Sequence, residues 1–317
     1  MRTVERIADL RALCEEVRRA GKTVGLVPTM GYFHEGHRSL MRAARARHDV
    51  VVVTIFVNPL QFGAHEDLDG YPRDLAGDTA AAAAEGVDVL FTPSLAEMYP
   101  EPTRTTVHVD GLTAGLCGAA RPTHFDGVTT VVTKLFAIVG PSTAYFGRKD
   151  AQQLAVVRRM AADLNLPVEV VGCPLVREPD GLAMSSRNAY LSAEERRAAT
   201  VLSGALRTAC GAVVAGERDP AAITSALEAT VATEPLVELE YAEVRRGADL
   251  EPVEHLDGEL LVAVAAQVGS ARLIDNVTIT IAGAEVTTDL GVITTANERP
   301  RAGQSLSGWP GPQRVSP

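Results

Sequence analysis

Short apolar runs alternate with segments of helical spacing over the first half of the chain. The runs are continuous and rich in β-branched residues, which is typical of parallel strands that are buried on both faces. Strands are therefore expected at Thr23–Val27, Val50–Val57, Val87–Thr92, Arg104–Val109, Thr143–Phe146 and Leu166–Val171. A first helix is expected at Val4–Arg19, with Thr3 as its cap. This order predicts an α/β fold, a doubly wound and mostly parallel sheet from Thr23 to Cys173.

The second half of the chain has a different pattern. Ser192 and Glu195 form a capping box that opens a helix to about Val214, and a second helix ends near Thr233. Strands are expected at Val237–Val244, Leu260–Ala265 and Ala271–Ile281, which together predict a second, smaller α+β domain. The last residues are rich in Gly, Pro and Ser, so a flexible tail is expected, with no function for Trp309. The expected boundaries are 1–175, 176–283 and 284–317.

Composition narrows the class of protein. The chain has 317 residues, of which 46% are hydrophobic and 22% charged, and its net charge is −10. This charge argues against a broad nucleic-acid surface, so any anion site must be local. The four cysteines are scattered, as in reduced thiols, and no apolar run suits a signal peptide or a membrane span. We therefore expect a cytoplasmic protein that binds small molecules, neither nucleic acid nor membrane.

The most informative stretch is PTMGYFHEGH (28–37), between the first strand and a helix-favouring segment at Arg38–Arg47. Ligands bind at the carboxyl ends of parallel strands, and a helix that starts there directs free N–H groups at an anion. Gly36 allows close backbone approach, and His34 and His37 can donate hydrogen bonds to developing charge. The alternatives are two solvated loop histidines or a zinc pair, but nothing nearby supplies a third zinc ligand.

Two further polar segments follow predicted strands and should reach the same edge of the sheet, and a third lies at the junction between the two domains. Asn58 and Gln61 suit a ligand with hydroxyls and a carboxylate, although an ordinary polar loop has the same composition. GRKD (147–150) offers the compact charge of Lys149, or simply a helix start with a solvated lysine. MSSR (184–187) supplies two hydroxyls and a guanidinium that can hold a triphosphate, or is a serine-rich linker. Several strand ends of the first domain that carry polar groups together favour one coordinated site.

Two single residues carry weaker indications. Asp78 lies on a predicted alanine-rich helix and is a candidate magnesium ligand, although acidic residues on exposed helix faces are common. Arg121 lies in a loop before the helix expected at Gly127–Val139, where it is either a counter-charge for phosphate or carboxylate or a surface arginine.

The residues at 28–37 and GLAMSSRN at 181–188 resemble the paired motifs of the His-x-Gly-His adenylyl-transferring superfamily, and more narrowly those of the pantothenate synthetase (pantoate–β-alanine ligase) family. RLIDN (272–276) is similar to the closing segment of that family. The resemblance implies a Rossmann-like nucleotidyltransferase fold with a smaller C-terminal lid domain. It implies that pantoate and β-alanine are joined through a pantoyl adenylate, with ATP and Mg²⁺, to give pantothenate, AMP and pyrophosphate. It also implies a homodimer.

Site residues implied by the resemblance fall into three groups. His37, His34 and Lys149 would be catalytic, and Gln61 and Gln153 would hold pantoate with Asn58 nearby. The residues that would bind ATP are Met30, Gly31, His34, Gly36, His37, Gly147, Arg148, Lys149, Asp150, Val176, Met184, Ser185, Ser186 and Arg187. Cys117 stands where some members of the family carry an acid linked to contacts between subunits.

Two other functions compete with the ligase. A nucleotidyltransferase of the same fold would leave the nucleotide on a phosphate-bearing acceptor, whereas Asn58, Gln61 and Gln153 suit a small carboxylic acid better than a phosphate. A non-catalytic nucleotide-binding module would tolerate loss of His37 and Lys149. A nicotinamide enzyme is not supported, because the glycine spacing is not G-x-G-x-x-G.

Overall fold

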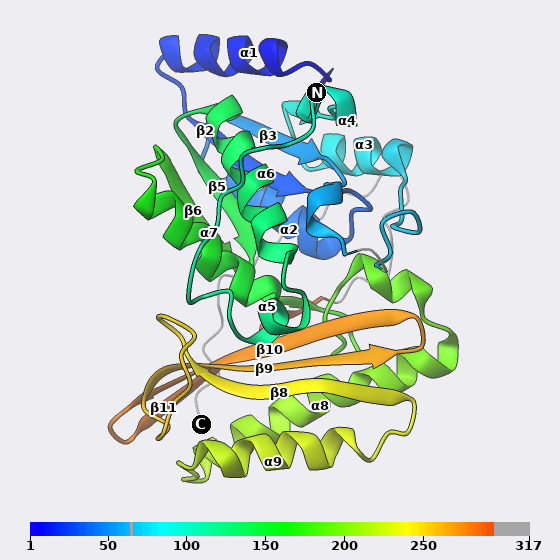
Figure 1. Ribbon diagram of the computed structural model, residues 1–317, viewed down its shortest axis with the longest axis vertical. Helices are drawn as coiled ribbons and strands as arrows, with labels where there is room; N and C mark the ends of the chain where they lie inside the picture. The colour runs from blue at the N-terminus through cyan, green and yellow to red at the C-terminus, as the bar shows by residue number, and fades with distance from the viewer. Residues whose placement is uncertain (64–65, 295–317) are drawn as a thin grey trace.

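The computed structural model describes residues 1–63 and 66–294. The N-terminal part contains a six-stranded sheet in the order β1-β4-β3-β2-β5-β6, and every pairing in it is parallel (Figure 1). Its strands are β1 (Arg2–Val4), β2 (Val24–Thr29), β3 (Val50–Ile55), β4 (Val89–Phe91), β5 (Ser142–Gly147) and β6 (Val168–Cys173). The predicted α/β fold with a doubly wound parallel sheet is confirmed.

Helices cover both faces of this sheet because alternate strand residues are apolar on both sides. Val52 of β3 packs in a core with α1, α6 and α7, whereas Val51 and Val53 pack on the opposite face with α2 and α3. The helices are α1 (Ile7–Arg19), α2 (Glu35–Arg45), α3 (Leu75–Ala84), α4 (Leu95–Met98), α5 (Leu116–Ala120), α6 (His124–Val139) and α7 (Ala151–Asp163). Short 3₁₀ turns lie at η1 (Pro59–Gln61) and η2 (Arg148–Asp150).

The C-terminal part is an antiparallel sheet with its own core, backed by two helices (Figure 1). After β7 (Val176–Arg177) and η3 (Ser186–Tyr190) come α8 (Ala193–Val214), α9 (Pro220–Val231), β8 (Val237–Arg246), β9 (Gly258–Val268), β10 (Ala271–Ala282) and β11 (Glu285–Asp289). The expected capping box is present, since Ser192 and Glu195 exchange both hydrogen bonds. Among the described residues, no helix combines the length and the apolar character that crossing a bilayer requires.

Three expectations from the sequence are wrong in detail. The tail was expected from residue 284, but β11 and β12 (Val292–Ile293) lie within it, and β12 pairs with β7. Residues 295–317, including Trp309, lie outside the described residues. The first helix begins at Ile7 rather than Val4, because residues 2–4 pair with β4 and the Glu97 carboxylate accepts from the Ile7 amide at 2.8 Å.

The third difference concerns residues 104–109, which lie outside any strand. Hydroxyls of α6 hold this segment instead of a neighbouring strand. The amide of Val107 donates to Thr130 Oγ1 at 3.0 Å, and the carbonyl of Val107 accepts from Thr129 Oγ1. Side-chain partners thus satisfy backbone groups that a strand would have paired within the sheet.

Candidate active site

The carboxyl ends of β2, β3 and β5 open into one cavity of about 230 Å³, here called the inner cavity. The two histidines, Lys149 and the Ser185–Arg187 segment all line it, although they lie far apart along the chain. This convergence is the geometry that the predicted sheet topology requires. The predicted site residues that line the cavity are Met30, His34, Gly36, His37, Gln61, Gly147, Lys149, Asp150, Gln153, Val176, Met184, Ser185, Ser186 and Arg187.

His34 and His37 are built into the N-terminus of α2 as its capping box. His34 Nδ1 accepts from the Gly36 amide at 3.1 Å, and His37 Nδ1 accepts from the His34 amide at 3.4 Å. A ring nitrogen that accepts from an N–H carries no proton, so the proton of each neutral ring resides on Nε2. Helix capping therefore fixes the tautomer of both imidazoles and leaves each with one donor.

Both rings are neutral at physiological pH. Burial lowers the pKa of His37 to about 4, with Asp150 opposing this effect and Lys149 adding to it. Burial also lowers the pKa of His34 well below its ordinary value, and the neighbouring His37 and Lys149 lower it further. The ring centroids of the two histidines are 4.1 Å apart, so two imidazolium charges would repel strongly. The pair can act as hydrogen-bond donors but not as cations.

Asp78 holds the turn that precedes these histidines. Its carboxylate, on α3, accepts from the amides of Tyr32 at 2.7 Å and Phe33 at 2.6 Å. Gly31 has a φ of +89°, and a Cβ there would meet Asp78 Oδ2 at 2.9 Å. Asp78 is thus engaged by the backbone rather than presented to a metal ion, and Gly31 shapes the turn without lining the cavity. These contacts give no support to the expected ATP contact of Gly31 or the expected metal role of Asp78, and both stay predictions.

Gln61 reaches the cavity, whereas Asn58 lies behind it. Asn58 is fully buried, and its amide donates to Gln61 Oε1 at 3.2 Å and to the Gly127 carbonyl at 3.0 Å. The Tyr99 hydroxyl donates to Asn58 Oδ1 at 2.8 Å. The expected substrate contact of Asn58 is therefore replaced by an indirect role, in which it orients Gln61. Gln61 Nε2 also lies 3.1 Å from the Met30 sulfur, where it donates a hydrogen bond.

His124 is a cavity residue that the sequence analysis missed, and Arg121 beside it was left open. His124 Nδ1 donates to the Gln61 carbonyl at 2.8 Å, and Nε2 accepts from Arg121 at 3.2 Å. Burial lowers the pKa of His124 to about 4, helped by the Arg121 charge. Arg121 also forms a salt bridge with Glu66. The sequence signal was the RPTHF segment at the start of α6, which becomes informative only when α6 is packed against η1.

A second set of contacts that the sequence did not predict joins the Ser185–Arg187 segment to residues 67–71. Arg187 donates to both carboxylate oxygens of Asp67, at 3.1 and 2.8 Å, and Tyr190 donates to Asp67 at 3.2 Å. The hydroxyls of Tyr71 and Ser186 lie 3.0 Å apart. The Ser185–Arg187 segment is therefore hydrogen-bonded directly to residues 67–71, which precede α3.

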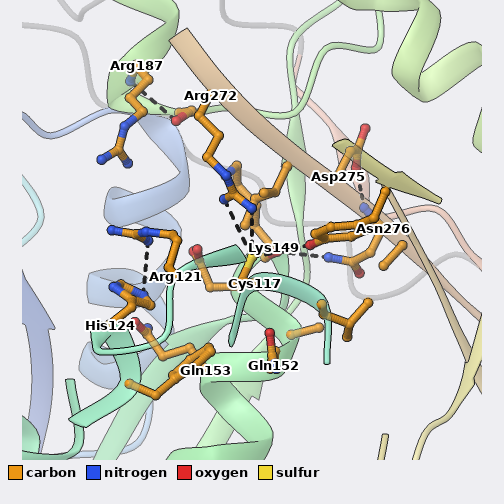
Figure 2. Close-up of a pocket in the computed structure, with 18 of the residues that line it drawn as sticks. Cys117, Arg121, His124, Lys149, Gln152, Gln153, Arg187, Arg272, Asp275 and Asn276 are labelled. Carbon is orange, nitrogen blue, oxygen red and sulfur yellow. Dashed lines mark hydrogen bonds between the residues drawn. The ribbon is translucent and has the colours of Figure 1, made fainter. Parts of the chain in front are cut away.

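Lys149 joins the inner cavity to a larger neighbouring one of about 390 Å³, here called the outer cavity, between α7 and the C-terminal sheet. Within the described part of the chain, Lys149 forms no salt bridge. Figure 2 shows Lys149, Arg121, His124 and Arg187 around the outer cavity, with Arg272 beside Arg187 and Cys117 beside Lys149. Arg148 pairs with Asp289 at 2.9 Å and lines neither cavity, so its expected contact with nucleotide stays a prediction.

Known proteins of one family match this chain over most of its length. The family model for pantoate–β-alanine ligase matches residues 2–278. Pantothenate synthetase from Heliobacterium modesticaldum is 57% identical over 89% of this chain and 100% of its own length. The enzyme of that name from Acetivibrio thermocellus is 52% identical over the same shares.

Solved structures agree with these matches. The crystal structure of pantothenate synthetase from Thermus thermophilus superposes with a TM-score of 0.83, at 48% identity, over 87% of this chain and 98% of that one. The pantoate–β-alanine ligase of Francisella tularensis, complexed with β-γ ATP and β-alanine, gives a TM-score of 0.72 at 31% identity, over 87% of this chain and 97% of that one. The chain therefore belongs to the pantoate–β-alanine ligase family.

Proposed function

We propose that this protein is an ATP-dependent ligase that joins pantoate to β-alanine through a pantoyl adenylate and releases AMP and pyrophosphate. The observation that carries the proposal is the convergence of His34, His37, Lys149 and Ser185–Arg187 on one cavity at the carboxyl ends of the parallel strands. Family membership supports the same reaction. The Francisella ligase, which was crystallised with a form of ATP and β-alanine, supports these substrates.

The first step activates a carboxylate, which is a poor acylating agent because its leaving group would be oxide. A pantoate carboxylate oxygen bonds to the α-phosphorus of ATP, and the bond from that phosphorus to the bridging oxygen of the leaving pyrophosphate breaks. Negative charge builds on the phosphate oxygens, so fixed donors that meet it lower the barrier. We assign this role to Nε2–H of His34 and His37 and to the ammonium of Lys149. The backbone amides at the start of α2 add the positive end of a helix.

In the second step the neutral amine of β-alanine attacks the acyl carbon, and the bond from that carbon to the AMP oxygen breaks. The new amide nitrogen loses a proton to solvent. No side chain needs to act as a covalent nucleophile, because holding the amine beside the mixed anhydride supplies much of the rate. The Ser185–Arg187 segment and its ties to Asp67 and Tyr71 keep water from the adenylate.

Pantoate selectivity is assigned to the amides of Gln61 and Gln153, which line the inner cavity. Each amide can donate and accept, as a ligand with hydroxyls and a carboxylate requires. Asn58, Tyr99 and His124 hold Gln61 from behind. A phosphate-bearing acceptor would require further unpaired cations here, whereas the two arginines in this lining, Arg121 and Arg187, are paired with Glu66 and Asp67. The lining therefore supports the ligase over a nucleotidyltransferase.

A resident magnesium site does not fit the residues that the structure describes. Asp78 is engaged by two backbone amides, and the described chain contains no group of three or more His, Cys, Asp or Glu side chains that could hold a metal ion. Mg²⁺ commonly binds to substrate phosphates with few protein ligands. We propose that magnesium arrives with ATP as part of the substrate. We further propose a homodimer, on family membership alone.

The decisive experiment mixes the purified protein with ATP, magnesium, pantoate and β-alanine and measures AMP and amide, with each substrate omitted in turn. We expect AMP and pantothenate in equal amounts only when all substrates are present. Nucleotide retained on the product would instead identify a nucleotidyltransferase. Nucleotide binding without turnover would identify a binding module.

A further inference from the structure

The RLIDN segment (272–276) resembles a family motif, but the proposed reaction gives it no role. The structure places its last residue, Asn276, against the main chain of Lys149. The segment lies on β10 of the C-terminal sheet, and the Asn276 side chain reaches the turn η2 at the N-terminus of α7. The Asn276 amide nitrogen donates to the main-chain carbonyl of Lys149 at 2.8 Å and to that of Arg148 at 3.1 Å. Figure 2 shows Asn276 beside Lys149 at the edge of the outer cavity.

Asn276 is itself held rigidly. Its backbone amide donates to Asp275 Oδ1 at 2.7 Å, and its backbone carbonyl accepts from Arg177 at 3.3 Å. Arg177 and Asp275 form a salt bridge of 2.7 Å in which both side chains are 2% exposed. Only 7% of Asn276 is exposed. The two amide donors therefore have little freedom to move away from η2.

Arg177 extends this anchor to other parts of the site. Its remaining N–H groups donate to the Leu290 carbonyl at 2.5 Å and to the Gly181 carbonyl at 3.1 Å. Gly181 lies just before the segment that leads to Ser185–Arg187, and Leu290 just before β12. The buried guanidinium of Arg177 thus connects Gly181, at the start of the segment that leads to Ser185, with β10. Through Asn276 it is also connected to the main chain of Lys149.

The position of the Lys149 ammonium is set mainly by the position of the Lys149 main chain. In the described chain it has no carboxylate partner that would fix it, and a lysine has four rotatable bonds. Where its ammonium can reach is then set by the position of its own main chain. η2 has no side-chain cap of its own. The two hydrogen bonds from Asn276 are contacts from the C-terminal domain that fix this main chain.

We propose that Asn276 is a positioning residue for adenylation, which places the Lys149 ammonium against the phosphates by clamping η2 from the C-terminal domain. This role rests on the proposed ligase function. A displacement of about 1 Å in a catalytic group can cost up to about a hundredfold in rate. Loss of both hydrogen bonds should therefore lower kcat by about tenfold to a hundredfold, with little change in the KM for pantoate.

A double-mutant cycle on the full chain tests this role. Asn276→Ala, Lys149→Ala and the double variant are compared with the native protein by AMP formation, in protein from a host that lacks its own pantoate–β-alanine ligase. If Asn276 acts through Lys149, Asn276→Ala lowers kcat in the native background and has no further effect once Lys149 is gone. Thr230→Ala is the control, because this hydroxyl of the same domain lies on α9, lines neither cavity and also donates to a main-chain carbonyl, that of Ala226 at 2.7 Å. We expect it to leave kcat unchanged.

The outcomes separate three cases. Equal losses from Asn276→Ala in both backgrounds would overturn the proposal, because the effect would not pass through Lys149. Asn276→Leu, a variant of similar size without the amide donors and without charge, is run in the same cycle and should behave like Asn276→Ala. Thermal unfolding of every variant is measured, and if both substitutions at Asn276 unfold the protein, the residue serves stability alone and the proposal fails. No turnover by the native protein would refute the ligase function instead.

Discussion

His34 performs two tasks with its two ring nitrogens, and substitution can separate them. Nδ1 caps α2 by accepting from the Gly36 amide. Nε2–H is the group that we propose as a donor to the phosphates. Asparagine can replace the first task, since its side-chain oxygen is among the best N-caps, but it has no group at the position of Nε2. Glutamine places an amide N–H near the position of Nε2 and loses the short-range cap.

Each task has an expected size. Loss of a helix N-cap costs about 1 kcal/mol of stability, with a range of about 0.5 to 2. Loss of one donor to a developing oxyanion costs about a hundredfold to a thousandfold in kcat. His34→Asn should therefore unfold at nearly the native urea concentration while turnover falls at least about a hundredfold. His34→Gln should lose about 1 kcal/mol of stability and keep more activity than His34→Asn.

Two measurements on the same preparations decide the matter, namely urea unfolding followed by circular dichroism and the rate of AMP release with saturating substrates. His34→Ala is the reference variant, because it lacks both groups and should show both losses. Native turnover by His34→Asn would show that Nε2–H makes no contact in the transition state. A His34→Gln variant as stable as the native protein would show that Nδ1 contributes nothing as a cap.

Three further predictions follow from single contacts. The pKa of His37 lies near 4 in the folded protein and near 6.5 in the unfolded chain, so the unfolded chain takes up the proton first. The free energy of unfolding should therefore fall by up to about 3 kcal/mol as pH drops from 6.5 towards 4. Urea unfolding at several pH values should show a smaller fall in His37→Gln. Arg177→Met leaves Asp275 buried without its partner and should cost about 3–5 kcal/mol in urea unfolding; the variant that also carries Asp275→Asn should recover part of this loss. Gly127→Ala places a Cβ in collision with the Leu60 carbonyl and 2.5 Å from the backbone nitrogen of Gln61. Displacement of Gln61 should raise the KM for pantoate in steady-state assays, and an unchanged KM would contradict the role assigned to Gln61.

The sequence predicted the parallel sheet because its strands are long, continuous apolar runs. It did not predict β1, whose three residues carry no pattern and become a strand only by pairing with β4. The same contrast holds in the site. His34 and Lys149 were predictable because sheet topology brings strand ends together, whereas Ser186 was expected from the resemblance to the family motif.

Three roles were not predictable because they depend on side chains from elements that are distant in sequence. Asn58 looked like a ligand-binding residue, yet α6 covers it and turns it towards Gln61. Asp78 looked like an exposed helix acid, yet the turn before α2 folds onto its carboxylate. The RPTHF segment that contains His124 was not informative by itself, because the partners of His124 are the Gln61 carbonyl and an arginine three residues before it. Periodicity places elements, but the partner of a buried polar group is decided by packing.

The protonation states in the site assign positive charge to Lys149 and oriented hydrogen-bond donors to the two histidines. Positive charge has to meet the triphosphate, yet two adjacent imidazoliums beside Lys149 would repel one another and the lysine. Burial keeps both rings neutral, and the N-cap of α2 fixes which nitrogen of each ring carries the proton. In the proposed reaction the histidines contribute directed donors that need no reorientation as charge moves, and the long-range attraction comes from the lysine. A mobile lysine is useful here only if its backbone is fixed. The C-terminal sheet supplies that fixed point through Asn276, and this makes the second domain part of the chemistry rather than only a cover over it.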